Sequence, residues 1–273
     1  MLSSLAKAIA LTNNPVALIW SDAAPAGAMQ FKSGKWGCVA SLFGSVAKTG
    51  RTAVIDRATY GCWGGGVGLG FGNCYETFPG GFAGFCGFLA DGNSQTETGR
   101  QIGEGLAQAG AKELADDFLH GEQYMASADA TERFVQALPM VDIAASYVVL
   151  KPLSAVDPQI DNVKNVTFFA EPHALSALVI LANRSHPERE NVGIPYAAGC
   201  QVIGILAYKE LASEHPRALV GLTDVSARQK VRGSLGGNVM SFTIPWPMFL
   251  GMEEQVDSSF LQRNTWRSLL QEA

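Results

Sequence analysis

Short apolar runs alternate with amphipathic stretches along most of the chain. The run "PVALIW" (residues 15–20) is short, apolar and bounded by turn residues, which predicts a buried strand. "SYVVLKPL", "RALVGL" and "GNVMSFTIP" predict further strands, and "CVASLFGSVAKTG" predicts a helix that begins at Cys38 and ends near Gly50. Strands that alternate with helices favour the α/β or α+β class. We expect a single mixed domain over residues 1–273, a sheet flanked by helices, with a weak subdivision near residues 157–164.

One segment breaks the alternation. Residues 61–92 contain twelve of the thirty glycines and three of the five cysteines, and neither a helical nor a period-2 pattern survives there. We therefore predict a long irregular Gly/Cys-rich loop. Ordered loops of this length inside compact domains usually carry function or move, so we expect this segment to be functional.

Composition and net charge indicate the oligomeric state, the partners and the location that we expect for this protein. Hydrophobic residues make up 47% of the chain and charged residues 16%, which suggests surface hidden in an oligomer, and we expect a homodimer. A net charge of −5 disfavours nucleic acid and anionic membranes as partners. Asn13, Asn14 and Pro15 interrupt the apolar N-terminal stretch, and no run is long enough to cross a membrane. We expect a cytoplasmic protein.

Common catalytic and nucleotide-binding motifs fail at the residue level. Neither the dinucleotide pattern G-x-G-x-x-G nor a P-loop is present, and the four histidines form no metal-binding pair at helical spacing. A charged cluster follows residue 223: Asp224, Arg228, Lys230 and Arg232. It is either a solvated helical face with an i,i+4 pair between Asp224 and Arg228, or an anion-binding edge near the cysteines.

The five cysteines are the candidate ligands for a metal or an iron–sulfur cluster. They lie at positions 38, 62, 74, 86 and 200. Their odd number argues against complete disulfide pairing, and the absence of a C-x-x-C pair argues against a zinc ribbon. An iron–sulfur cluster needs only thiolates that converge in space, and neighbouring glycines would let backbone N–H groups approach its sulfides. The alternative is that these cysteines are small buried hydrophobes.

Several blocks of the chain are familiar together. "PVALIWSDAAPAGA", "GCVASLFGSVAKTG", "GCWGGGVGLGF", "VTFFAEPHALSALVILANRS", "AAGCQVIGILA" and "GNVMSFTIP" resemble, in order, the blocks of the DUF169 family over residues 11–261. The family's recurring cysteines match Cys38, Cys62 and Cys200, and the resemblance implies a metal or iron–sulfur centre on them. Cys86, flanked by glycines, is our choice of fourth ligand and Cys74 the alternate.

These observations predict a cytoplasmic iron–sulfur protein. A [4Fe–4S] cluster on Cys38, Cys62, Cys86 and Cys200 would serve electron transfer to a redox partner or redox chemistry on a small molecule. Two alternatives stay open: a metal-free small-molecule binding protein with a Gly-rich lid, and an enzyme with a single reactive cysteine such as Cys38. Substrate and reaction are left open, as is whether the protein is an enzyme.

Overall fold

The chain divides into two compact units, each described here by itself. The structure, a computed structural model, describes residues 1–272. Unit 1 combines residues 1–71 with the chain from residue 142 onward, and unit 2 comprises residues 72–141.

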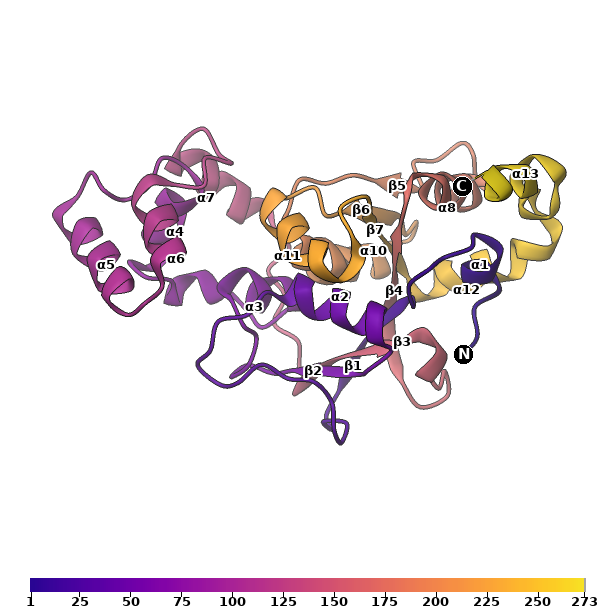
Figure 1. The fold of residues 1–273 in the computed structure, drawn as a ribbon, viewed down its shortest axis with the longest axis horizontal. Helices are drawn as coiled ribbons and strands as arrows, with labels where there is room; N and C mark the ends of the chain where they lie inside the picture. Colours follow the sequence, from indigo (N-terminus) through magenta and orange to yellow (C-terminus); the bar gives the residue numbers. More distant parts are fainter. Residues whose placement is uncertain (273) are drawn as a thin grey trace. The chain divides into compact units, whose positions relative to one another are not determined.

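Unit 1 is built on one seven-stranded mixed sheet with the order β2-β3-β1-β4-β7-β6-β5. All neighbouring strands are antiparallel except β5 and β6, which are parallel. Helices cover the sheet on both faces, which confirms the expected α/β or α+β class (Figure 1). The strands are β1 (Val16–Ser21), β2 (Ala53–Ile55), β3 (Tyr147–Pro152), β4 (Asn162–Ala170), β5 (Val192–Gly193), β6 (Ala218–Gly221) and β7 (Met240–Pro245).

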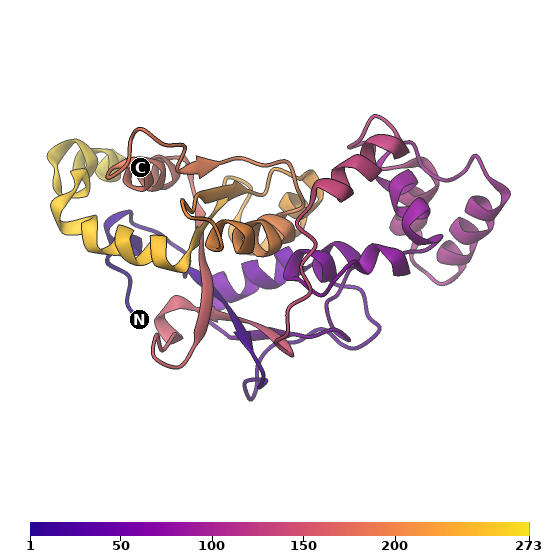
Figure 2. The same ribbon diagram turned by 180° about the vertical axis from the view of Figure 1, so that it is seen from behind.

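One face of the sheet carries the main hydrophobic core. Alternate strand residues such as Ile19, Phe168 and Phe242 point to this face, where Phe249 and Trp266 from the covering helices join them. The covering helices, seen from behind in Figure 2, are α1 (Ser4–Ala8), α8 (Pro172–Asn183), α12 (Trp246–Gln255) and α13 (Asn264–Glu272), with short 3-10 turns η2 (Leu153–Ala155), η4 (Val256–Ser258) and η5 (Phe260–Gln262). This face binds the layers together by apolar burial.

The opposite face of the sheet carries the helices that begin at Cys38, Cys62 and Cys200. Helices α2 (Val39–Thr49) and α11 (Val225–Leu235) pack against each other there, and the helix over residues 199–211 packs onto β4 and β7 (Figure 1). This helix has three parts: α9 (Gly199–Gln201), the π-helix η3 (Val202–Leu206) and α10 (Ala207–Leu211). Helix α3 (Trp63–Leu69) packs against its first two parts.

The π-helix has an identifiable partner in the sheet. Asn165 of β4 is completely buried, and its Nδ2 donates a hydrogen bond of 2.9 Å to the carbonyl oxygen of Ile203. A π-turn disturbs the regular hydrogen-bond ladder of a helix, so a carbonyl inside it needs a partner from outside. Asn165 supplies that partner and fixes the helix that begins with Cys200.

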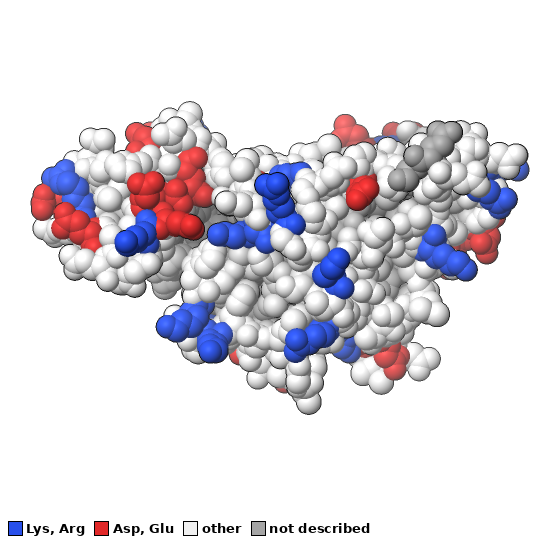
Figure 3. All heavy atoms as spheres, viewed as in Figure 1, with Lys and Arg blue, Asp and Glu red and all other residues white. Residues whose placement is uncertain are grey.

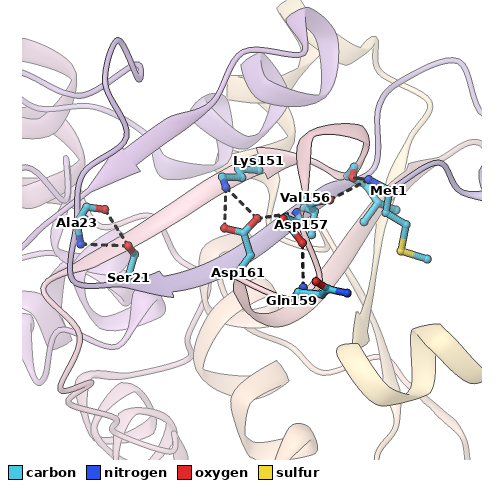
Figure 4. A network of polar contacts seen from close by, with 9 residues as sticks. Met1, Ser21, Ala23, Lys151, Val156, Asp157, Gln159 and Asp161 are labelled. Atoms are coloured by element: carbon cyan, nitrogen blue, oxygen red, sulfur yellow. Dashed lines mark hydrogen bonds and ion pairs between the residues drawn. The ribbon is translucent and has the colours of Figure 1, made fainter.

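Residues 157–161 belong to the connection between β3 and β4 within unit 1, and residues 162–164 begin β4; the subdivision expected near residues 157–164 stays a prediction. Figure 4 shows the polar contacts of this connection. Asp161 accepts two hydrogen bonds from Lys151 Nζ, at 2.6 and 2.8 Å, and a third from the backbone amide of Asp157 at 2.9 Å. The ion pair is largely shielded from solvent and holds the connection against β3.

Unit 2 is helical and packs around aromatic side chains. Tyr75 and Phe85 stack with ring centroids 3.7 Å apart, and Phe78 contacts Phe85, Phe88 and Phe118. Ten acidic side chains outnumber three basic ones in this unit, and Figure 3 shows many of the acidic groups gathered over its helices. The elements are η1 (Cys74–Thr77), α4 (Gly81–Leu89), α5 (Glu97–Gln108), α6 (Lys112–His120) and α7 (Ala128–Ala137).

The prediction of a long irregular Gly/Cys-rich loop is wrong. Residues 61–92 contain α3, η1 and α4. Five of the seven residues of α3 are buried: Gly65, Gly66, Val67, Gly68 and Leu69. Tertiary packing therefore overrides the low helix propensity of glycine. Across the described part of the chain, no helix has both the length and the apolar character needed to cross a membrane.

Candidate functional site

Cys38 lies at the start of α2. It is the N-cap residue, with extended backbone, and its side chain is half-buried. The buried face of α2, which includes Val39, Phe43 and Val46, fixes this helix against the sheet, and Gly50 ends it in the left-handed conformation at φ +69°. The predicted helix boundaries at Cys38 and Gly50 are thus confirmed, and they place the thiol at a helix N-terminus.

Cys62 occupies the same position on α3. It is the N-cap of that helix, and its Sγ accepts a hydrogen bond of 3.3 Å from the backbone N–H of Gly65. The N–H of Gly37 donates to the carbonyl of Gly61 at 3.2 Å. Because each of these glycines directly precedes a cysteine, this bond brings the starts of α2 and α3 together.

Burial controls the protonation of Cys62. The pKa of this thiol is raised to about 12, mainly by burial and also by the charge of Cys38. The backbone amides of Gly65, Val39 and Gly64 act in the opposite direction. The sulfur therefore sits among N–H groups that would stabilise a thiolate, although the metal-free site keeps the thiol protonated at neutral pH.

Cys200 completes the group from a distant part of the sequence. It lies in the first turn of α9, is buried, and its Sγ donates a hydrogen bond to the carbonyl of Gly64 at 3.1 Å. Burial raises its pKa well above the ordinary value, and the charges of Cys62, Cys38 and Asp224 raise it further. We call Cys38, Cys62 and Cys200 the cysteine centre.

Glycines allow the close approach of α3 and α9. A Cβ on Gly68 would lie 2.8 Å from the carbonyl carbon of Cys200 and 2.9 Å from the amide nitrogen of Gln201. Tyr208 adds a hydrogen bond of 3.2 Å from its hydroxyl to the carbonyl of Leu69. Side chains larger than hydrogen at Gly68 would push apart the two helices that carry Cys62 and Cys200.

The chemistry of this donor set fits an iron–sulfur cluster. Three thiols gather at three helix starts, where N–H groups and helix dipoles favour negative charge. The charge of Cys38 raises the pKa of Cys62, and the charges of Cys62 and Cys38 raise the pKa of Cys200. Within residues 1–272, no three His, Cys, Asp or Glu side chains stand close enough to hold a single metal ion. In a [4Fe–4S] cluster each thiolate binds a different iron, so its ligands lie further apart than those of one ion.

The other two cysteines belong to unit 2. Cys74 begins η1 and Cys86 lies within α4, and both are buried. Burial raises the pKa of the Cys86 thiol, and the charge of Glu132 adds to the effect. The structure thus brings together three of the four predicted ligands within one unit, while the assignment of Cys86 as the fourth stays a prediction.

Sequence reasoning missed the environment of Asp224. A solvated helical face is wrong for this residue, because Asp224 is half-buried at the N-cap of α11 and its charge reaches Cys200. Arg228 forms no ion pair or hydrogen bond with it among the described residues, although its charge lowers the pKa of Asp224; its guanidinium donates to the carbonyls of Leu222, Val239 and Gly237. The i,i+4 spacing gave no signal of this. Asp224 does lie near Cys200, while the alternative of an anion-binding edge near the cysteines stays a prediction.

Comparison with known proteins identifies the family. Residues 4–255 match the family model of DUF169, described as "Uncharacterised ArCR", so the chain belongs to that family. No curated protein and no solved structure matches the chain.

Proposed function

We propose that this member of the DUF169 family is an iron–sulfur protein whose [4Fe–4S] cluster is held by Cys38, Cys62 and Cys200. One observation carries the proposal: three cysteines far apart in the sequence lie together at three helix starts in unit 1. Such a cluster, when bound, supplies one-electron transfer or an iron site for redox chemistry on a small molecule.

The chain's own groups would bind and hold the cluster's thiolate ligands. Because the Cys62 and Cys200 thiols are protonated at neutral pH, each releases a proton when it becomes a ligand. The amides of Gly65, Val39 and Gly64 then stabilise the negative charge on the Cys62 sulfur. Burial of Cys200 keeps water away from that side of the centre.

The number of ligands bears on the kind of chemistry. Three thiolates from unit 1 leave one iron for another group, and an open or exchangeable iron favours chemistry on a small molecule. Four closed thiolates, with Cys86 as the fourth, would favour electron transfer to a redox partner. We place small-molecule redox chemistry first, because three cysteines are what unit 1 brings together.

The two alternatives have less support. A nucleophilic cysteine needs a lowered pKa, which argues against Cys62, Cys86 and Cys200, because their pKa values are all raised. A reactive Cys38 stays an alternative. A Gly-rich lid needs a mobile loop, whereas the glycines of residues 64–68 lie in helix α3, and three of them, Gly65, Gly66 and Gly68, are buried. Within the described residues no cysteine forms a disulfide, which suits the reducing cytoplasm that we propose as the location.

Anaerobic purification followed by an absorbance spectrum and iron and sulfide assays tests the proposal. We expect a broad band near about 400 nm and about four irons and four sulfides per chain. Cys38→Ser, Cys62→Ser and Cys200→Ser should each lower the iron content more than about tenfold, since each removes a ligand from the cluster.

Cys74→Ser is the matched control, because it changes a buried thiol of unit 2. It should retain the spectrum of the unmodified chain. A colourless, metal-free protein after anaerobic purification and after reconstitution with iron and sulfide would refute the proposal.

A further inference from the structure

One carboxylate oxygen of Asp224 is buried without a well-formed hydrogen bond among the described residues. Its Oδ2 caps α11 by accepting a hydrogen bond of 3.2 Å from the amide of Ala227. Its Oδ1 is buried and makes no hydrogen bond of ordinary geometry to the described residues. Burial raises the pKa of this carboxyl, while the backbone amide of Gly199 and the charge of Arg228 act weakly in the opposite direction. Buried polar atoms are almost always partnered, and an unpartnered carboxylate oxygen is especially costly, so this atom points to a group that binds there.

This oxygen lies beside the cysteine centre. A Cβ on Gly199, the residue before Cys200, would lie 3.5 Å from Asp224 Oδ1. The charge of Asp224 is one of the causes that raise the pKa of Cys200. Helix α11 also packs on α2, whose start is Cys38, and Ser41 Oγ donates to the carbonyl of Lys230 at 3.0 Å across that contact. The carboxylate is therefore held at a fourth helix start next to the three thiols.

The turn that delivers Asp224 is unusual in two respects. Leu222 is fully buried and adopts φ +60°, a conformation that a branched residue rarely takes without compensation. The hydroxyl of Thr223, next in the chain, is a second buried oxygen without a partner among the described residues. Two adjacent unpartnered oxygens thus lie on the side of the centre that α11 covers.

The contacts of Arg228 leave this oxygen available. Its guanidinium donates to the carbonyls of Leu222, Val239 and Gly237, at 3.3, 3.1 and 2.7 Å. It therefore fixes the turn around Asp224 without donating a hydrogen bond to Oδ1, although its charge lowers the pKa of the carboxyl. Cys86, the ligand that the sequence favours, belongs to unit 2, whereas Asp224 is in the same unit as the three thiols.

We infer that Asp224 Oδ1 is the fourth ligand of the centre, a carboxylate oxygen beside three thiolates. The inference rests on the proposed function and deepens it. Iron accepts oxygen ligands, and a carboxylate is a weaker ligand for cluster iron than a thiolate. With a cluster bound, a small molecule with an oxygen, nitrogen or carbon donor atom would replace the Asp224 carboxylate at this iron. The substrate class is therefore a small molecule that binds iron directly.

Spectroscopy on the reconstituted full chain tests the inference, with cyanide as the iron-binding probe. In the unmodified chain we expect cyanide to change the electron paramagnetic resonance spectrum of the reduced cluster, because it displaces the carboxylate. Asp224→Cys should remove this response, lower the reduction potential, and protect the one iron in about four that chelators otherwise remove.

Two further variants keep the experiment decisive. Asp224→Asn retains the helix cap, so its melting temperature should stay near that of the unmodified chain while the labile iron is lost faster. Cys86→Ser should leave the cyanide response and the iron content unchanged.

The outcomes separate the two proposals. A cluster that ignores cyanide, is unaltered by Asp224→Cys and loses one iron in Cys86→Ser would overturn the role of Asp224 and leave the iron–sulfur function standing. A chain that binds no cluster at all would refute both.

Discussion

The position of Cys200 relative to Cys62 depends on the absence of a single methyl group. Gly68 packs against backbone atoms of Cys200 and Gln201, which cannot rotate away as a side chain can. The short residue also lets α3 bring the carbonyl of Gly64 within hydrogen-bonding distance of the Cys200 thiol. The glycines of this segment therefore serve helix packing, a purpose that composition alone does not distinguish from loop flexibility.

Gly68→Ala should destabilise the protein. The added Cβ would meet the carbonyl carbon of Cys200 at 2.8 Å, so α3 and α9 must separate, at a cost of about 1–3 kcal/mol in the free energy of unfolding. Urea unfolding measures the change. The control is Gly233→Ala in α11, where an added Cβ meets nothing within 4 Å and better helix propensity should stabilise by up to about 1 kcal/mol. Equal effects of the two substitutions would contradict the packing argument.

At the scale of elements, the π-helix joins the sheet to the cysteine centre. Asn165 is a buried polar residue in a central strand, and its amide is the partner of the Ile203 carbonyl. The hydrophobic pattern of residues 197–213 predicts one helix, and the structure confirms a helix from Gly199 to Leu211. The hydrophobic pattern does not predict the π-turn inside this helix, because the partner of its carbonyl is a side chain on a strand 38 residues earlier.

Asn165→Ala should loosen this helix. The substitution leaves a buried carbonyl without its donor, which costs about 1–3 kcal/mol. We expect faster amide hydrogen exchange over residues 199–211 than in the unmodified chain, with less change in α8 and α12 on the opposite face of the sheet. Asn238→Ala, at an exposed position, is the control and should leave both stability and exchange unchanged. Unaltered exchange over residues 199–211 in Asn165→Ala would show that the π-turn does not need this partner.

Element boundaries were largely predictable where pattern and end signals agree. The strand "PVALIW" appears as β1, and Cys38 and Gly50 flank α2 as expected. The segment of residues 61–92 failed because glycine opposes a helix locally, while burial against α2 and α9 supplies the missing stability from outside the segment. The low helix propensity of glycine can be read from the local sequence, whereas the burial of α3 against α2 and α9 is visible only in the folded structure.

At the scale of the whole molecule, topology decides which cysteines meet. The sheet order places helices from both ends of the chain on one face, so Cys38 and Cys62 lie beside Cys200. The family resemblance pointed to these three residues, although spacing alone did not separate them from Cys74 and Cys86. Nor could the sequence show that Asp224 faces Cys200, because the turn at Leu222 requires a backbone conformation that leucine seldom adopts.

The raised pKa values make the stability of the metal-free protein sensitive to alkaline pH. The Cys62 thiol has a pKa of about 12 in the folded chain against an ordinary value of 9.0, and the pKa values of Cys200 and Tyr208 are also raised. The folded state therefore retains protons that the unfolded state releases above about pH 9. The stability from these protonated groups is fully present below pH 9.0 and is lost as the pH rises toward 12.

We expect the melting temperature of the metal-free protein to fall steadily above about pH 9, and Cys62→Ser to flatten that fall because serine does not titrate there. Ligand binding has the opposite sign: thiols lose their protons when they bind iron, so the cluster should be held more weakly as the pH falls. Calorimetry in two buffers of different ionisation enthalpy measures the protons released on metal binding. A melting temperature that stays level from pH 9 to 11, with no proton release on metal binding, would contradict the assignment of buried neutral thiols to the cysteine centre.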